Sequence, residues 1–287
     1  MPLPNFIIFG TRKAGTTSLY HYLSQHPEIY MSTLKGSRFF LYDPAEPKKG
    51  KNIPVKTLEA FSELFDGAIK KKAKAVGEAS PTYINSSMAA DRIRATLPNV
   101  KLIASLRHPV DRTYSHYQME MRYRRGDDRV PLSANNIPQW ADVGLYSKHL
   151  KHYFEIFDPS QIKIIILEEW QTDPLAMLRD VYRFLEVDEN FIPDLKTKYN
   201  AGGVPRSSLI ASILRPRSFH IKLKPYIPES IRSAANRIRN MNMRKAPPLV
   251  PELRHHLQEF FRDDILALQE LIRKDLSIWL EDSGSQR

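Results

Sequence analysis

Basic, hydroxyl-bearing and glycine residues follow the first apolar run of the chain. Residues 6–9 (FIIF) are followed by Gly10, Arg12, Lys13 and Gly15, and then by the letters TTSL. Where a strand passes through such a loop into a helix, backbone N–H groups and the positive end of the helix dipole point at an anion. Glycine lets the backbone approach that anion closely, and lysine adds a mobile positive charge. The pattern predicts a phosphate-binding loop.

The spacing is similar to a Walker A loop, G-x4-G-K-[ST], but the lysine lies elsewhere. Thr16 stands at the position of the Walker lysine, and Lys13 lies inside the loop. A nucleotide triphosphatase also needs an Asp at a strand end to help hold Mg²⁺, whereas the apolar run 101–106 (KLIASL) is followed by Arg107. Transfer from a donor without a β,γ-phosphate chain needs cations and N–H groups but no metal. This chemistry favours sulfuryl transfer, with an ATP-dependent P-loop kinase as the alternative enzyme.

A second arginine and a serine form a further candidate phosphate site. Arg107 follows the predicted strand at 101–106, and Ser115 lies about two helical turns further along the chain. A guanidinium fixed at the end of a strand and a hydroxyl on the following helix can hold one phosphate from two sides.

With these two motifs the sequence resembles the PAPS-dependent sulfotransferase family, especially its bacterial members related to the heparan sulfate sulfotransferases. PAPS is 3'-phosphoadenosine 5'-phosphosulfate. In that family an R-K-x-G-T-[TS]-[ST]-L loop binds the 5'-phosphosulfate, and an R-x-P-x-x-R-x-x-S motif, here RHPVDRTYS, binds the 3'-phosphate. The resemblance implies the following donor-binding residues: Arg12, Lys13, Ala14, Gly15, Thr16, Thr17, Ser18, Arg107, Ser115 and, in the later segment NAGGVPRS, Arg206.

The resemblance covers nearly the whole chain, because weaker segments such as FFLYD, GEASPTY and LEEWQTDP follow in the family's order. It implies an enzyme that moves a sulfuryl group from PAPS to an acceptor hydroxyl or amine, carbohydrates among them, without a metal. Lys13 is implied as the catalytic lysine that stabilises charge on the leaving phosphate.

One position departs from the family pattern. Members of this branch carry K-E-x-x-F-F, in which the Glu deprotonates the acceptor, whereas this chain reads KGSRFF with Gly36 at the Glu position. Either the chain lacks this base or another residue supplies it. Glu78, at a predicted strand end, is one candidate, with an orienting role toward Lys13 or a loop amide as the alternative. His116, next to Ser115, is the other, with simple packing as the alternative.

Lys35 and Arg38 flank Gly36, and we interpret them as cations that face the acceptor, with a solvated surface as the alternative. The segments expected to line the acceptor cleft, at 35–43, 123–140 and 206–245, contain no recognisable code. The sequence therefore does not name the acceptor.

The charge balance keeps a non-catalytic alternative open. Lys and Arg number 43 against 32 Asp and Glu, which gives a net charge of +11, and residues 206–245 hold ten of these bases and one acid. Such a segment is typical of an anion- or nucleic-acid-binding protein or of a solvated basic surface. Given the two phosphate motifs, we expect no specific nucleic-acid partner.

Apolar runs at 6–9, 75–78, 101–106 and 163–167 predict strands buried on both faces, and segments at 17–24 and 175–185 have helical periodicity. Alternation of the two predicts an α/β fold: one P-loop-like domain over 1–287 with a central parallel sheet flanked by helices. We expect an irregular basic segment at about 205–248 and a C-terminal helical segment at about 252–281.

The chain contains no cysteine, which excludes disulfides and thiolate chemistry and is compatible with a reducing compartment. No stretch approaches the roughly 18 apolar residues that a membrane span requires. We therefore expect a cytoplasmic protein without a transmembrane segment.

Overall fold

The computed structural model describes residues 1–47, 52–121, 132–133, 136–196, 204–206, 238, 241–244 and 246–281. Most of the basic segment predicted at about 205–248 lies outside these residues. Its described part includes a short antiparallel pair, β6 (Val204–Pro205) and β7 (Met243–Arg244).

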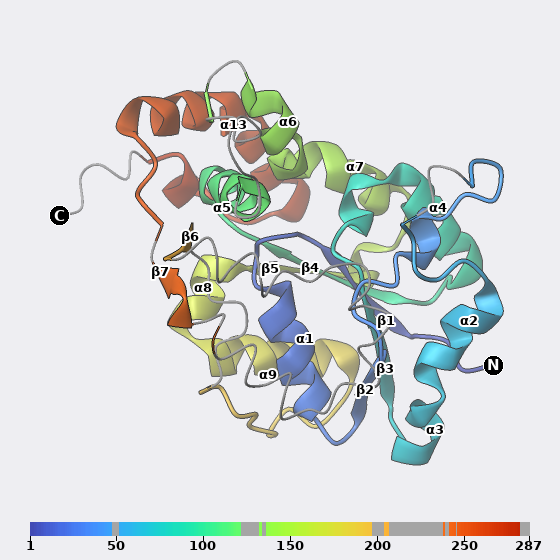
Figure 1. The fold of residues 1–287 in the computed structure, drawn as a ribbon. Coiled ribbons are helices and arrows are strands. Elements are labelled where there is room, and N and C mark those ends of the chain that lie inside the picture. The colour runs from blue at the N-terminus through green and yellow to red at the C-terminus, as the bar shows by residue number, and fades with distance from the viewer. Residues whose placement is uncertain are drawn as a thin grey trace.

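Five parallel strands form the central sheet, in the order β2-β3-β1-β4-β5 (Figure 1). The strands are β1 (Phe6–Gly10), β2 (Ile29–Met31), β3 (Ala75–Ala79), β4 (Lys101–Leu106) and β5 (Ile162–Ile166). All four predicted apolar runs are strands of this sheet, and β2 is an additional short strand at its edge. The α/β fold with a central parallel sheet is confirmed.

Helices connect the strands and cover both faces of the sheet. The α-helices are α1 (Thr16–Gln25), α2 (Leu58–Ser62), α3 (Gly67–Lys71), α4 (Ser87–Thr96), α5 (Pro109–Met121), α6 (Ile137–Ala141), α7 (Tyr146–Ile156), α8 (Leu167–Thr172), α9 (Pro174–Leu185) and α13 (Pro251–Ile272). Short 3-10 helices lie at Phe39–Leu41, Glu63–Phe65, Tyr83–Asn85, Asp142–Gly144, Pro159–Gln161 and Ser277–Trp279.

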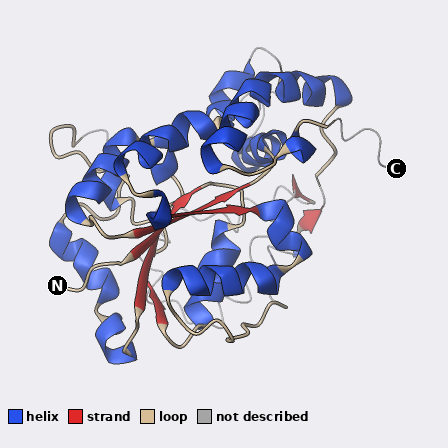
Figure 2. Ribbon diagram, turned by 180° about the vertical axis from the view of Figure 1, so that it is seen from behind, coloured by secondary structure: helices blue, strands red, loops and turns tan. Residues whose placement is uncertain are grey.

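The side chains of β1 alternate between two hydrophobic layers, as the period of two along a strand requires. Ile7 and Phe9 pack in the layer that also holds residues of α4, α7 and α13. Phe6 and Ile8 pack in the other layer, with residues of α1 and α9. Figures 1 and 2 show α1 and α9 on one side of the sheet and α4, α7 and α13 on the other. The strands are therefore buried on both faces, which explains their continuous apolar sequences.

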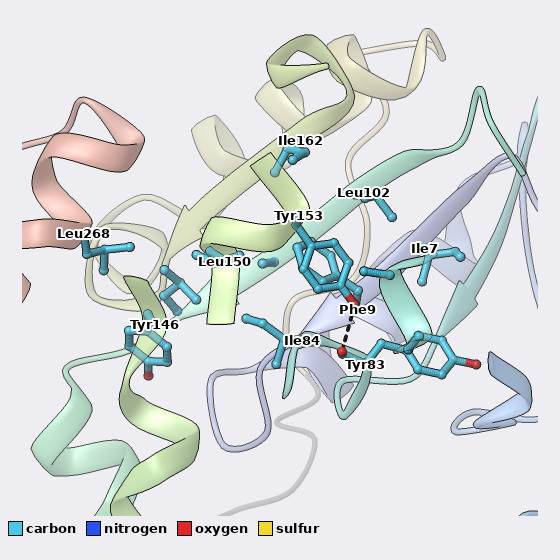
Figure 3. Packing of buried hydrophobic residues seen from close by; sticks show 14 of the residues in the cluster. Ile7, Phe9, Tyr83, Ile84, Leu102, Tyr146, Leu150, Tyr153, Ile162 and Leu268 are labelled. Atoms are coloured by element: carbon cyan, nitrogen blue, oxygen red, sulfur yellow. Dashed lines mark hydrogen bonds between the residues drawn. The ribbon is translucent and has the colours of Figure 1, made fainter. Parts of the chain in front are cut away.

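Tyr153 of α7 links the first layer to the segment that follows β3. Its ring lies 4.5 Å from that of Phe9, and its hydroxyl donates a hydrogen bond of 2.8 Å to the carbonyl oxygen of Tyr83 (Figure 3). All three side chains are fully buried. Burial of a ring of this size contributes roughly 1.5–3 kcal/mol. These contacts fix the end of residues 77–83, one of the family-like segments.

The C-terminal helix α13 packs on α7. It begins with Pro251, whose ring suits the first turn of a helix, and Leu257, Phe261, Ile265 and Leu268 form its buried face. The carboxylate of Asp264 accepts hydrogen bonds from the backbone N–H and the hydroxyl of Ser147, in the first turn of α7. The helix ends at Ile272, and the short 3-10 helix at Ser277–Trp279 follows.

The strand order places a change of direction between β1 and β4. From β1 the chain continues to β2 and β3 on one side, whereas β4 and β5 lie on the other side. In open parallel sheets, ligands bind at the carboxyl ends of the strands where the order changes direction. The two sequence motifs follow β1 and β4, so the topology brings them to this edge.

Candidate functional site

A cavity of about 1070 Å³ lies at this edge of the sheet. Its volume is slightly above the usual range for ligand pockets, roughly 300–1,000 Å³. The lining includes residues of both motifs and of the segments after β2, β3 and β5: Arg12, Lys13, Gly15, Thr16, Thr17, Ser18, Tyr22, Lys35, Gly36, Arg38, Ser80, Pro81, Thr82, Arg107, Ser115, Met119, Leu167, Trp170, Gln171, Pro174 and Leu195.

The phosphate loop, residues 11–15, joins β1 to α1. Gly15 has a φ of +80°, and a Cβ there would lie 2.5 Å from Trp170 Cζ3 and 2.9 Å from a methyl group of Leu167. Only glycine satisfies both the left-handed backbone and the close contact with α8. The helix that begins at Thr16 consequently starts at the cavity wall, where its first N–H groups can bind an anion.

Ser105 holds the phosphate loop in place from the neighbouring strand. Its carbonyl accepts a hydrogen bond of 2.9 Å from the Thr11 N–H, and its hydroxyl donates one of 2.5 Å to the Ala14 carbonyl. Ser105 was not among the residues predicted for the site. The signal in the sequence was a polar residue within the otherwise apolar end of a buried strand, KLIASL.

Arg107 and Ser115 both line the cavity beside the phosphate loop. Arg107 follows β4; its carbonyl accepts a hydrogen bond of 2.8 Å from the Tyr146 hydroxyl, and its guanidinium lies 3.5 Å from the Lys13 carbonyl. Ser115 lies on α5, the next helix. The structure therefore brings together the two motifs that the sequence placed far apart.

Arg112, the other arginine of the second motif, is buried and has a structural role. Arg112 is fully buried and donates hydrogen bonds to the Trp140 carbonyl and to the Thr113 hydroxyl. Burial lowers its pKa to about 10, which still leaves the guanidinium charged at neutral pH. Arg112 thus ties α5 to α6 and supports the helix that carries Ser115.

Residues 35–38 form a turn on the cavity wall, called here the 35–38 turn. Gly36 has a φ of +82°, and its N–H donates a hydrogen bond of 2.8 Å to the Ala79 carbonyl. The N–H of Arg38 donates to the Ser80 hydroxyl over 3.0 Å. Lys35, Gly36 and Arg38 line the cavity, so the position that departs from the family pattern faces the site.

Glu78 lies beneath this turn and is fully buried. Its Oε1 accepts hydrogen bonds from the hydroxyls of Ser37 at 2.8 Å and Ser80 at 2.6 Å. Burial raises the pKa of Glu78 to about 7, against the opposing effects of the two serines and the Lys35 charge. Glu78 is not part of the cavity lining, and its hydrogen bonds join the 35–38 turn, through Ser37, to Ser80 just after β3.

His116 also lies outside the cavity lining. Its Nδ1 is 3.4 Å from a guanidinium nitrogen of Arg112, and its Nε2 is 3.9 Å from Glu120, which also pairs with Arg12 at 3.7 Å. Burial, followed by the charges of Arg112, Arg12 and Lys13, lowers the pKa of His116 to about 3. The imidazole is therefore neutral at pH 7 and a weak base.

Two of the predicted donor-binding residues, Ala14 and Arg206, do not line the cavity. Ala14 lies within the phosphate loop with its side chain buried, and its carbonyl accepts the hydrogen bond from the Ser105 hydroxyl. Arg206 is exposed, is not part of the cavity lining, and donates its backbone N–H to the Asn242 carbonyl. Its predicted role in donor binding stays a prediction.

The charge of the cavity wall is entirely positive in the described part of the chain. Five lining residues are cationic: Arg12, Lys13, Lys35, Arg38 and Arg107. No Asp, Glu or His of the described residues belongs to the lining. Such a wall favours a highly anionic ligand. Within the same residues, no helix is long and apolar enough to cross a membrane.

The profile of a family described as "Sulfotransferase family" matches residues 4–191 of this chain. A sulfotransferase from Alicyclobacillus acidocaldarius is similar in structure, with 30% identity, a TM-score of 0.70 and coverage of 98% of this chain and 100% of that one. The mouse bifunctional heparan sulfate N-deacetylase/N-sulfotransferase 4 is 25% identical over 97% of this chain and 31% of its own length. The membrane-associated sulfotransferase kil1 of Dictyostelium discoideum is 38% identical over 45% of this chain and 26% of its own length. The chain thus spans less than a third of these two curated relatives.

Proposed function

Because the chain belongs to the sulfotransferase family, we propose that it transfers a sulfuryl group from PAPS to a hydroxyl or amine of an acceptor. The observation that carries the proposal is that one cavity holds both motifs and is lined by five cations and no acid among the described residues. PAPS carries phosphate at both the 5' and 3' positions, so it needs two separated anion sites. The phosphate loop and the Arg107–Ser115 pair supply two such sites.

In this proposal each donor group has its own partners. The N–H and hydroxyl groups of Thr16, Thr17 and Ser18 hold the 5'-phosphosulfate at the start of α1, with Arg12 and Lys13 beside them. Arg107 and Ser115 hold the 3'-phosphate. Negative charge develops on the 5'-phosphate as it leaves, and fixed donors around it lower the energy of the transition state.

The acceptor side is proposed to be the wall formed by the 35–38 turn. Lys35 and Arg38 are cations of the cavity beyond those assigned to the donor. The name of the mouse relative, a heparan sulfate N-sulfotransferase, supports a carbohydrate acceptor. A cytoplasmic location remains a proposal that rests on the sequence alone.

Donor binding is tested with adenosine 3',5'-bisphosphate, the desulfated product of PAPS. We expect it to raise the melting temperature in the presence of EDTA, because a ligand that binds only the folded state stabilises it. ATP with Mg²⁺ should raise it less. Equal or greater stabilisation by Mg-ATP would overturn the donor assignment in favour of the kinase alternative.

Arg107→Ala should weaken binding of the bisphosphate by about 1.5–3 kcal/mol, the range for a hydrogen bond to a charged group. Calorimetry with Arg94→Ala, an exposed arginine of α4 outside the cavity lining, gives the matched control for lost surface charge. If both variants bind as tightly as the parent, Arg107 does not hold the 3'-phosphate.

Transfer itself is tested by single-turnover kinetics with ³⁵S-labelled PAPS and a panel of hydroxyl and amine acceptors, including heparan fragments. Lys13→Ala should abolish measurable transfer while the melting temperature stays near that of the parent. Near-parental turnover in Lys13→Ala would remove Lys13 from the chemistry.

A further inference from the structure

We propose that Lys35 is the general base that deprotonates the acceptor, and that buried Glu78 positions Lys35 and balances its charge. This assignment rests on the proposed sulfuryl transfer and identifies the group that takes the place of the glutamate expected at Gly36.

The composition of the cavity wall narrows the candidates. Among its described residues, arginines stay protonated, and the hydroxyl groups of serine, threonine and Tyr22 are proton donors at neutral pH. The lysines remain as groups whose neutral form accepts a proton. Lys13 belongs to the phosphate loop, where a positive charge is needed on the donor side. Lys35, on the separate 35–38 turn, is the remaining candidate.

Other titratable groups near the site are poorly placed. Glu78 is fully buried beneath the turn and does not reach the cavity lining. His116 points at Arg112 and Glu120 and also lies outside the lining. His21 of α1 is outside the lining as well. Each would need a rearrangement before it could contact an acceptor.

The surroundings of Lys35 lower the pKa of its ammonium group, as a general base requires. Burial lowers the pKa of its ammonium group, and the Glu78 charge opposes this effect. His21, on α1, also interacts with Lys35 electrostatically, because the Lys35 charge contributes to lowering the pKa of that imidazole. A lysine whose pKa is lowered has more neutral amine at physiological pH, which is the form that accepts a proton.

Glu78 supports Lys35 in two ways. Through Ser37 and Ser80 its Oε1 fixes the 35–38 turn, and Ser80 also accepts the N–H of Arg38. Its other carboxylate oxygen, Oε2, is buried and has no hydrogen-bond partner among the residues that the structure describes. A buried carboxylate near an amine favours the protonated ammonium, so it stabilises Lys35 once the proton has arrived. Glu78 is thus a positioning residue.

The step balances as follows. The acceptor O–H or N–H bond breaks, and its proton passes to the neutral Nζ of Lys35. The freed electron pair of the acceptor forms a bond to sulfur, and the bond between sulfur and the bridging oxygen of the 5'-phosphate breaks. That oxygen keeps the bonding electrons, and Lys13 and the start of α1 stabilise its charge. Lys35 later releases its proton to solvent.

The variants Lys35→Arg and Lys35→Gln test whether Lys35 acts as a general base or contributes only a positive charge to binding. Arginine keeps the positive charge but stays protonated, whereas glutamine removes both properties. We expect both variants to lose roughly 10²–10⁴-fold in single-turnover transfer, the usual contribution of a general base. Their affinity for adenosine 3',5'-bisphosphate should stay within about threefold of the parent, because Lys35 belongs to the acceptor side; this measurement also verifies that they fold.

Retention of near-parental transfer in Lys35→Arg would overturn the assignment and leave Lys35 as a binding charge. The parent enzyme distinguishes this failure from that of the proposed function. If the parent and Lys35→Arg transfer the label equally well, only the assignment of Lys35 as base is refuted. If the parent binds neither PAPS nor its product, the proposed sulfuryl transfer is refuted, and the assignment of the base fails with it.

Glu78→Gln provides a readout that a purely structural role would not change. Its Oε1 can still accept from Ser37 and Ser80, but the negative charge is gone. Since that charge raises the pKa of Lys35, its loss should move the rising limb of the pH–rate profile to lower pH, most clearly above about pH 7, where Glu78 is ionised. If the rising limb of the Glu78→Gln profile stays where it is in the parent, Glu78 does not act on Lys35. If Glu78→Gln loses transfer while Lys35→Arg keeps full activity, Glu78 is itself the base.

Discussion

The Ser105 hydroxyl donates a hydrogen bond of 2.5 Å to the Ala14 carbonyl and so connects β4 to the phosphate loop. The same residue accepts the Thr11 N–H at 2.9 Å, so the loop is held at both ends by one residue of the neighbouring strand. The conformation that presents N–H groups to an anion therefore depends on the register between β1 and β4 as well as on the loop sequence.

Ser105→Ala should weaken binding of adenosine 3',5'-bisphosphate and destabilise the fold. The variant leaves the buried Ala14 carbonyl without its partner, which costs about 1–3 kcal/mol. Ser62→Ala is the control, because the Ser62 hydroxyl donates the same kind of bond, to the Pro2 carbonyl at 3.0 Å, and neither residue lines the cavity. Calorimetry and urea denaturation should show lost stability in both variants and lost affinity in Ser105→Ala. If Ser105→Ala and the parent bind the bisphosphate with equal affinity, the Ser105–Ala14 hydrogen bond does not shape the site.

Gly15 and Gly36 offer a comparison between two glycines with nearly the same backbone angle. Their φ values are +80° and +82°, but a Cβ at Gly15 would lie 2.5 Å from Trp170, whereas a Cβ at Gly36 would have no atom of the described residues within 4 Å. Gly36→Ala should cost only the left-handed strain, about 1–2 kcal/mol, and Gly15→Ala a further 1–3 kcal/mol for overpacking. Urea denaturation measures the difference; a Gly36→Ala variant as unstable as Gly15→Ala would contradict it.

The sheet could be predicted because its strands are buried on both faces. Runs such as FIIF and KLIASL have few alternatives to a buried parallel strand, and all four predicted runs are strands. β2 (Ile29–Met31) was not predicted, because three residues are too few for either periodicity to be recognised. The end of the last helix was also not predictable to the residue, since apolar residues continue beyond Ile272 as far as Trp279.

The residues proposed to bind the donor could be located from the sequence because they lie in two short motifs that follow strands. Lys35 and Arg38 were also predicted, and both line the cavity, but the contacts behind their turn could not be predicted because they join distant residues. Ser37 and Ser80 approach Glu78 from segments about forty residues apart, and the carboxylate that the sequence placed at a strand end is fully buried. The aspect of Lys35 that suggests base chemistry, its burial next to Glu78, likewise arises only in the folded chain.

His116 should make the protein less stable in acid. Its pKa is lowered to about 3 in the folded protein, whereas an unfolded chain binds the proton near pH 6.5. Because the unfolded state takes up this proton first, the free energy of unfolding should fall as the pH drops below about 6.5, by on the order of 2 kcal/mol at pH 5. His116→Gln should flatten this slope in urea denaturations at pH 7 and pH 5. His255→Gln, exposed on α13, is the control and should keep the parental slope; an equally steep slope in His116→Gln would contradict the linkage.

Gly36→Glu restores the carboxylate that the family pattern expects, and its effect depends on which residue is the base. The new side chain meets little resistance from the described part of the chain, where no atom lies within 4 Å of a Cβ at Gly36, but its backbone has to adopt a φ of +82°. We therefore expect a loss of stability of about 1–2 kcal/mol, equal to that of Gly36→Ala, and almost unchanged affinity for adenosine 3',5'-bisphosphate.

If Lys35 is the base, Gly36→Glu alone should not accelerate transfer, because an added negative charge next to Lys35 raises its pKa and reduces the neutral amine. In the Lys35→Arg background the same substitution supplies a base where none is left, and single-turnover transfer should rise at least tenfold, toward the range of roughly 10²–10⁴ that a placed general base contributes. Gly36→Ala in that background carries the same backbone strain without the carboxylate and should give no rise. A large gain from Gly36→Glu in the parent would instead show that the parent lacks a working base and that Lys35 does not fill the position.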